Sequence, residues 1–126
     1  MGDRICIRLT DGDRTSPLFY GHWCGISALK DMNDALRDEN NGMMNIMCNF
    51  IVRVMGGKVQ SRSYYLYNYD ESNATMADWD NWCWTFDMDR GLWTTTFPGL
   101  SDRSMTMGDV DDYVARNGDA TITIRI

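Results

Sequence analysis

A histidine and a cysteine two residues apart, His22 and Cys24, are the side chains of this sequence best suited to chemistry. On a strand they project from the same face, and Cys24 immediately precedes a predicted helix, whose N-terminal dipole favours a thiolate. A thiolate beside an imidazole is the arrangement of a cysteine nucleophile and its general base. Together with Tyr20, these residues define one hypothesis, a thiol enzyme or a small-molecule binder.

The spacing and the neighbouring sequence count against catalysis. Same-face neighbours on a strand have Cα atoms about 6.6–7 Å apart, so a direct bond between His22 and Cys24 requires the chain to bend. No residue is marked as an orienting aspartate or an oxyanion hole, and most lone thiols pack as small apolar groups. The preferred prediction therefore names no catalytic residue.

Motifs for metals, nucleotides and hydrolysis are also missing from the sequence. Cys6, Cys24, Cys48 and Cys83 fall singly, without the closely spaced pairs that are typical of zinc sites. No GxxxxGK[ST], GxGxxG, GxSxG or HExxH motif occurs. We expect no metal, no cofactor, and free thiols in a reducing compartment.

The elements that position these residues follow from hydrophobic periodicity and turn signals. Residues 5–10 alternate as in a half-buried strand, and a short connection to the next strand favours an antiparallel hairpin. The predicted order is ββααβββαβ, with strands at 5–10, 18–24, 61–69, 81–87, 92–97 and 121–126 and helices at 27–38, 43–55 and 106–117. The sequence predicts a single domain over residues 1–126, a two-layer α+β fold with a largely antiparallel sheet.

Residues 43–57, MMNIMCNFIVRVMGG, form the segment around which we expect the fold to be built. The polar residues Asn45, Asn49 and Arg53 recur every four positions and form one narrow stripe on a helix. Gly56 and Gly57 supply the stop, since glycine takes the left-handed conformation that ends a helix. We expect a helix buried in the core on every side except that stripe.

Charge is distributed unevenly along the chain. Residues 1–60 contain seven Lys/Arg and seven Asp/Glu, whereas residues 61–126 contain five and eleven, so the net charge of −6 belongs to the second half. No Lys/Arg cluster is present to bind phosphates, and direct nucleic acid binding is disfavoured. No apolar run is long enough for a membrane span and no signal peptide is recognisable, which predicts a cytoplasmic protein.

Aromatic residues and carboxylates are concentrated together between residues 64 and 97. A four-residue loop between the predicted strands places Phe86 opposite Trp93 and Trp82 opposite Phe97. Such a set suits a protein interface, although it could equally stack on a base, hold a cation or pack beneath the helices. The predicted partner-binding residues are Asp70, Glu71, Asp78, Trp79, Asp80, Trp82, Asp87, Asp89 and Trp93.

The first 25 residues carry one resemblance. Met1-Gly2-Asp3-Arg4, a short strand, and then residues 20–25, YGHWCG, resemble a group of small proteins from phages, prophages and bacterial or archaeal genomes, which begin M-G-[ND]-R and carry Y-x-H-W-[ND]-G. Cys24 stands where the group has Asn or Asp. The resemblance implies an origin in a mobile element, where small acidic proteins often bind and block a host machine.

These observations predict a small, acidic, non-catalytic protein-interaction module. The expected partner is a host protein with a basic surface, and the expected role is that of a virus- or mobile-element-encoded inhibitor of a host nucleic-acid-binding defence complex, acting in the host cytoplasm. The alternative is the small-molecule binder or thiol enzyme centred on Tyr20, His22 and Cys24. The sequence leaves the oligomeric state open.

Overall fold

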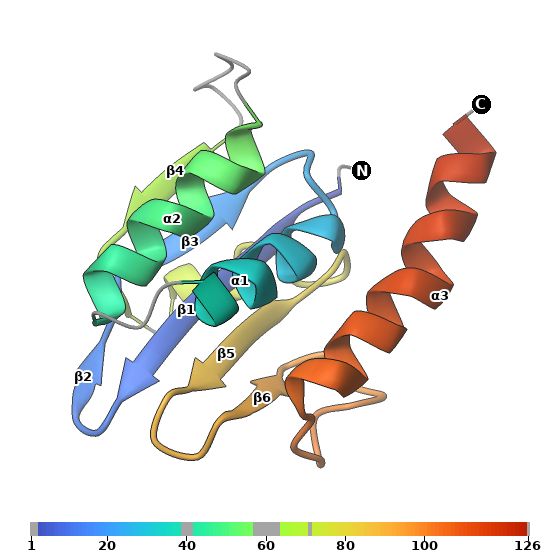
Figure 1. Ribbon diagram of the computed structural model, residues 1–126. Helices are drawn as coiled ribbons and strands as arrows, with labels where there is room; N and C mark the ends of the chain where they lie inside the picture. Colours follow the sequence, from blue (N-terminus) through green and yellow to red (C-terminus); the bar gives the residue numbers. More distant parts are fainter. Residues whose placement is uncertain (1–2, 39–41, 57–63, 71, 126) are drawn as a thin grey trace.

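In the described part of the chain, a six-stranded sheet carries three α-helices on one face. The computed structural model describes residues 3–38, 42–56, 64–70 and 72–125, with side chains described as far as residue 117. The elements are β1 (Ile5–Asp11), β2 (Arg14–Thr15), β3 (Leu18–Gly21), α1 (Ser27–Asp38), α2 (Met43–Met55), β4 (Tyr64–Tyr67), the 3-10 turn η2 (Asn73–Thr75), β5 (Cys83–Asp87), β6 (Leu92–Thr95) and α3 (Met107–Arg125) (Figure 1).

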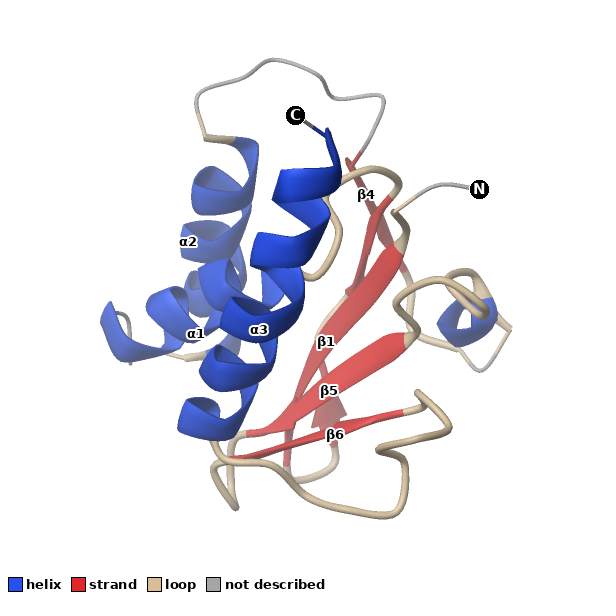
Figure 2. Cartoon of the chain, turned by 90° about the vertical axis from the view of Figure 1, so that its right-hand side faces the viewer, coloured by secondary structure: helices blue, strands red, loops and turns tan. Residues whose placement is uncertain are grey.

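The sheet has the strand order β4-β3-β1-β5-β6, and β2 pairs with β1. β1 and β5 run parallel, and the remaining pairs are antiparallel. Figure 2 shows α1, α2 and α3 as one layer and the sheet as the other. The predicted two-layer α+β fold and the antiparallel pairing of the first two long strands are therefore confirmed.

The core lies between the sheet and the helices. Alternation along β1 turns Ile5, Ile7 and Leu9 towards the helices, where all three are fully buried. The predicted register of the β5–β6 hairpin is confirmed, because Phe86 pairs with Trp93 and their rings lie 5.3 Å apart. Each large apolar side chain buried in this way contributes roughly 1.5–3 kcal/mol before entropy is counted.

Asn33 of α1 is a buried polar centre within this core. Its side-chain oxygen accepts a hydrogen bond from the Trp93 indole at 2.8 Å. Its amide nitrogen donates to the Met107 carbonyl at 3.0 Å and to the Asp111 carboxylate at 2.9 Å. One side chain thus links α1, β6 and α3, which leaves its buried polar atoms satisfied.

A capping box begins α3. The Thr106 hydroxyl accepts from the Asp109 N–H, and the Asp109 carboxylate accepts from the Thr106 N–H, both at 3.0 Å. The expected strand over residues 121–126 is wrong, since α3 continues to Arg125. Once a helix is nucleated, each residue adds a backbone hydrogen bond, and Gly118 opposes this by only about 1 kcal/mol.

The expected burial of α2 is also wrong, although the helix itself is confirmed. Gly56 ends it in the left-handed conformation, with φ 54°. Met43, Ile46, Met47 and Phe50 are buried, but Met44 and Val52 are 56% and 72% exposed. A helix in a two-layer fold has partners only beneath it and beside it, so its outer face stays uncovered.

Among the described residues, no helix combines the length and apolar character needed to cross a bilayer.

Replacing Asn33 with leucine should lower the free energy of unfolding by about 2–4 kcal/mol, because the Trp93 indole and the Met107 carbonyl lose a buried partner. Urea unfolding monitored by circular dichroism measures the change. Asn68→Leu, at an exposed position, is the control and should change stability by less than about 0.5 kcal/mol. Equal effects at the two positions would contradict the role assigned to Asn33.

Candidate functional site

Arg4 holds the loop of residues 76–82 against the start of β1. Its backbone N–H and side-chain Nε both donate to the Asp80 carboxylate, at 3.1 and 2.8 Å. Its Nη1 and Nη2 atoms donate to the carbonyls of Met76 and Asp78, at 3.0 and 3.1 Å. Four hydrogen bonds donated by one residue thus fix the path of the loop. No local sequence pattern indicates this contact, which joins residues 76 positions apart.

The backbone of this loop is held in a conformation that side chains disfavour. Trp79 and Trp82 have φ of 69° and 67°, and within the described part of the chain they are the only non-glycine residues with positive φ. Both the Asp80 and Trp82 N–H groups bond to the Ala77 carbonyl, at 3.1 and 3.0 Å. Such conformations cost on the order of 1–3 kcal/mol each and persist where surrounding contacts determine them, often at functional sites.

Trp79 and Trp82 of the loop and Phe97, which follows β6, form a chain of ring contacts that we call the aromatic row. Trp79 is 86% exposed. Its ring centroid lies 5.4 Å from that of Trp82, which stacks on Phe97 at 6.4 Å with an interplanar angle of 4°. The contact between Trp82 and Phe97 agrees with the register predicted for the hairpin. The row forms an apolar surface with one fully presented ring at its end.

Asp80 is a structural member of the site. Its side chain is only 8% exposed. Burial raises the pKa of this carboxyl, but the hydrogen bonds and positive charge of Arg4 outweigh that effect, and the pKa is lowered overall. Asp80 is therefore ionised at neutral pH and committed to Arg4.

The remaining predicted acids do not form one patch. Asp70 accepts hydrogen bonds from the Ser72 hydroxyl and the Asn73 N–H at the start of η2. These bonds lower the pKa of the Asp70 carboxyl. Asp87 accepts from the backbone N–H groups of residues 89 and 90 at the β5–β6 turn. The length of β5, about 13 Å, separates this turn from the Arg4 contact. Asp89 is exposed on the same turn, and Glu71 lies outside the described residues.

Trp93 has to be removed from the predicted binding residues. It is fully buried on the helix-facing side of β6, and its indole N–H is bonded to Asn33. Strand alternation explains this position, because Trp93 shares the core-facing side of β6 with Thr95. Of the nine predicted residues, the structure brings together Asp78, Trp79, Asp80 and Trp82.

His22 and Cys24 lie in different environments. The chain leaves β3 at Gly21, so neither residue is on the strand where the sequence placed them. The Tyr20 hydroxyl and His22 Nδ1 are 2.8 Å apart, and Tyr20 packs against the small cluster on the far face of the sheet. Cys24 instead packs against the main core. A Cβ atom at Gly21 would lie 2.2 Å from the Cys24 sulfur, which shows how closely the thiol is packed.

Burial also makes Cys24 a poor nucleophile. It raises the pKa of the thiol to about 12, so the thiol is protonated at neutral pH. The geometry therefore does not supply the nucleophile and base that the alternative hypothesis requires.

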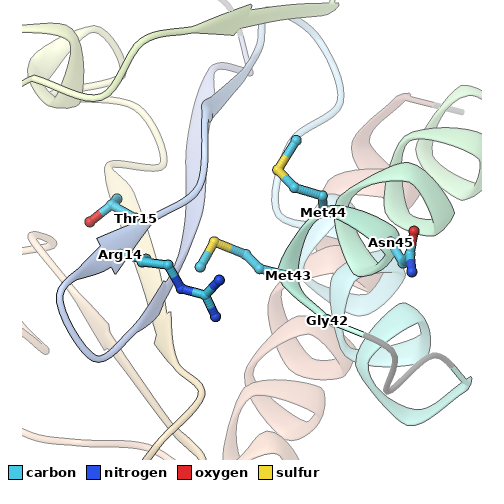
Figure 3. Close-up of a pocket in the computed structure, with 6 residues that line it drawn as sticks. All are labelled: Arg14, Thr15, Gly42, Met43, Met44 and Asn45. Atoms are coloured by element: carbon cyan, nitrogen blue, oxygen red, sulfur yellow. The ribbon is translucent and has the colours of Figure 1, made fainter.

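A hollow of about 540 Å³ lies between β2 and the start of α2, lined by Arg14, Thr15, Gly42, Met43, Met44 and Asn45 (Figure 3). Among the described lining residues the one charged group is Arg14, which is paired with Asp11 at 2.7 Å. These described residues offer no group of acids, bases or nucleophiles for a reaction. Nor does the described part of the chain contain three or more His, Cys, Asp or Glu side chains placed to hold a metal.

Comparison with known proteins adds no relative: no family model, curated protein or solved structure matches the chain.

Cys24 should resist alkylation in the folded protein because it is half-buried against the core and its thiol is protonated. The test uses Cys48→Ser, which removes the exposed cysteine, and iodoacetamide at pH 7. We expect no rapid modification of the native variant, and modification of Cys6, Cys24 and Cys83 after unfolding. Rapid, stoichiometric alkylation of native Cys24 would restore the thiol-enzyme hypothesis.

Asp80→Asn should destabilise the protein at pH 7, with a difference that shrinks in acid. The folded pKa of Asp80 lies below its unfolded value of about 3.9, so the stabilisation is complete above that value and is lost as pH falls through the folded pKa. Urea unfolding at pH 7 and at several values below 4 measures this. Asp89→Asn, on the exposed turn, is the control and should have little effect. A difference that stays constant into acid would contradict the assignment.

Proposed function

We propose that this chain is a non-catalytic protein-interaction module that binds its partner through the aromatic row. The observation that carries this proposal is the 86% exposure of Trp79 in a loop fixed by Arg4. Exposed large apolar side chains in a rigid setting are characteristic of binding sites, and tryptophan is prominent among binding hot spots.

The rigidity of the loop supports this role energetically. Binding normally costs the entropy of ordering side chains and loops. The hydrogen bonds that Arg4 donates and those that the Ala77 carbonyl accepts hold the loop backbone in the free protein. The fold therefore already holds the strained backbone at Trp79 and Trp82, and partner binding does not have to supply the free energy of that strain.

The proposed partner is a protein with Lys or Arg side chains on its binding surface. The chain has a net charge of −6, which favours encounter with a basic surface. A guanidinium or ammonium group can also stack on an exposed indole. Nucleic-acid-binding complexes present basic surfaces, so a module of this kind would act as an inhibitor by occupying such a surface. The resemblance to phage-associated proteins supports a mobile-element origin and a host defence complex as the target.

The structure changes where the contact is expected. The sequence suggested a broad field of carboxylates, but three of these acids are already bonded within the fold: Asp80 to Arg4, and Asp70 and Asp87 to nearby backbone N–H groups. In the present proposal, Trp79 supplies most of the contact energy, and the carboxylates contribute a general field that is screened by salt.

Trp79→Ala should reduce partner binding by about thirtyfold or more, the loss expected for a hot-spot side chain. The experiment is affinity capture with the tagged full chain from its natural host, followed by titration of the captured protein. Trp23→Ala is the matched control, because Trp23 is 56% exposed and its ring contacts His22 rather than the aromatic row. Binding should also weaken between 0.1 and 0.5 M salt.

Both variants should keep the wild-type circular dichroism spectrum, since neither indole is buried. Undiminished binding by Trp79→Ala, or binding that does not respond to salt, would overturn this proposal.

A further inference from the structure

A cavity of about 250 Å³ lies between the first turns of α3 and the loop that joins β6 to this helix (Figure 1). Its lining combines charged and apolar side chains. The loop contributes Leu100, Arg103 and Met105, and the helix contributes Asp112, Tyr113 and Arg116. The three helix residues lie within one turn of each other on one face of α3, so their side chains meet the same space.

Both walls of the cavity are fixed by the fold. On the loop side, Met105 is 7% exposed, and its N–H and carbonyl bond to the carbonyl and N–H of Trp93 at 2.9 and 2.7 Å. On the helix side, the capping box holds the first turn of α3, and the rings of Tyr113 and Trp84 pack with their centroids 5.4 Å apart. A ligand therefore meets walls that are already ordered, which reduces the entropy cost of binding.

Cations border the cavity on both sides, and neither is paired with an acid. Within the described residues, the side chain of Arg103 has no hydrogen-bond or ion-pair partner. Arg116 donates from Nε to the Asp112 carbonyl at 3.4 Å and forms no ion pair with a described residue. In α1, by contrast, Lys30 and Asp34 pair at 3.2 Å over the same spacing. An acid four positions before a base is the favoured order for such a pair, so the separation in α3 leaves both charges available to the cavity.

One carboxylate of the cavity is also available. Asp109, a further lining residue, is engaged in the capping box. The Asp112 carboxylate has no hydrogen-bond or ion-pair partner in the described part of the chain. Burial raises the pKa of Tyr113, so its phenol is uncharged at neutral pH and joins Leu100 and Met105 as contact surface. The cavity thus offers two guanidinium groups, one carboxylate and an apolar surface.

These charges select a small molecule that carries both an anionic and a cationic group. A carboxylate accepts paired hydrogen bonds from a guanidinium, and an ammonium group donates to a carboxylate. A ligand with only one of the two groups would leave a charge of the cavity unpaired or repelled. The 250 Å³ correspond to about eight water molecules at ~30 Å³ each, which is close to the size of one free amino acid.

We propose that this cavity binds a free amino acid with an apolar side chain, separately from the partner proposed for the aromatic row. Arg103 and Arg116 hold its carboxylate. Its ammonium group donates to Asp112, and its side chain packs on Leu100 and Met105.

Titration of the isotope-labelled full chain with L-leucine, followed by NMR, tests this proposal. L-Leucine should shift the resonances of the cavity residues with a dissociation constant of about 1 mM or lower. Isocaproate lacks the ammonium group and isoamylamine lacks the carboxylate, and both keep the leucine side chain. Each should bind at least about tenfold more weakly, because it leaves a charged group of the cavity without its partner.

Variants of the charged lining separate the two ends of the ligand. Asp112→Asn should weaken L-leucine binding at least about tenfold without weakening isocaproate, a difference that loss of structure would not produce. Arg103→Gln should weaken both ligands. Arg90→Gln and Asp89→Asn, on the exposed β5–β6 turn, are the matched controls and should leave binding within about twofold.

Three outcomes would overturn the proposal. The first is the absence of a saturable shift with L-leucine up to about 10 mM. The second is equal affinity for L-leucine and for isocaproate or inorganic phosphate, which would indicate a site for anions only. The third is L-leucine binding that Asp112→Asn leaves unchanged.

Discussion

β1 is covered on both of its faces, and this requirement organises the molecule. Its helix-facing side chains Ile5, Ile7 and Leu9 are buried by the layer of helices. Its opposite face carries Cys6, which is also fully buried and needs its own cover. That cover is the segment after β4, where Ala74 and Ala77 pack against Cys6. Because this segment must lie across the sheet, Arg4 at the start of β1 can reach it and position the loop that displays Trp79.

The sequence was informative wherever structure depends on neighbouring residues. The reciprocal bonds of Thr106 and Asp109 could be read from their spacing, and so could the pairing of Phe86 with Trp93 across a short turn. It was misleading where distant elements decide the outcome. Apolar composition could not reveal that Met44 and Val52 lack a covering partner. Alternation in the last residues suggested a strand, whereas a helix already nucleated continued through them.

The candidate site shows the same limit. Composition drew attention to residues 78–82, but it could not separate acids that hold the backbone from acids free to meet a partner. Asp70 and Asp87 proved to be local acceptors, and Trp93 proved to be core. The contact that fixes the site joins Arg4 to residues more than 70 positions away, and no local pattern encodes such a bond.

The parallel pairing of β1 with β5 has a consequence for how the chain is made. Bonded residues on these strands, such as Arg8 and Thr85, are 77 positions apart. Closing so long a loop costs chain entropy, and this cost is offset only when the contacts between the two strands form. On the ribosome, β1 must therefore wait until synthesis has passed Asp87 before its central neighbour is complete. During that interval its apolar side chains depend on the β3 hairpin and the first two helices for protection from aggregation.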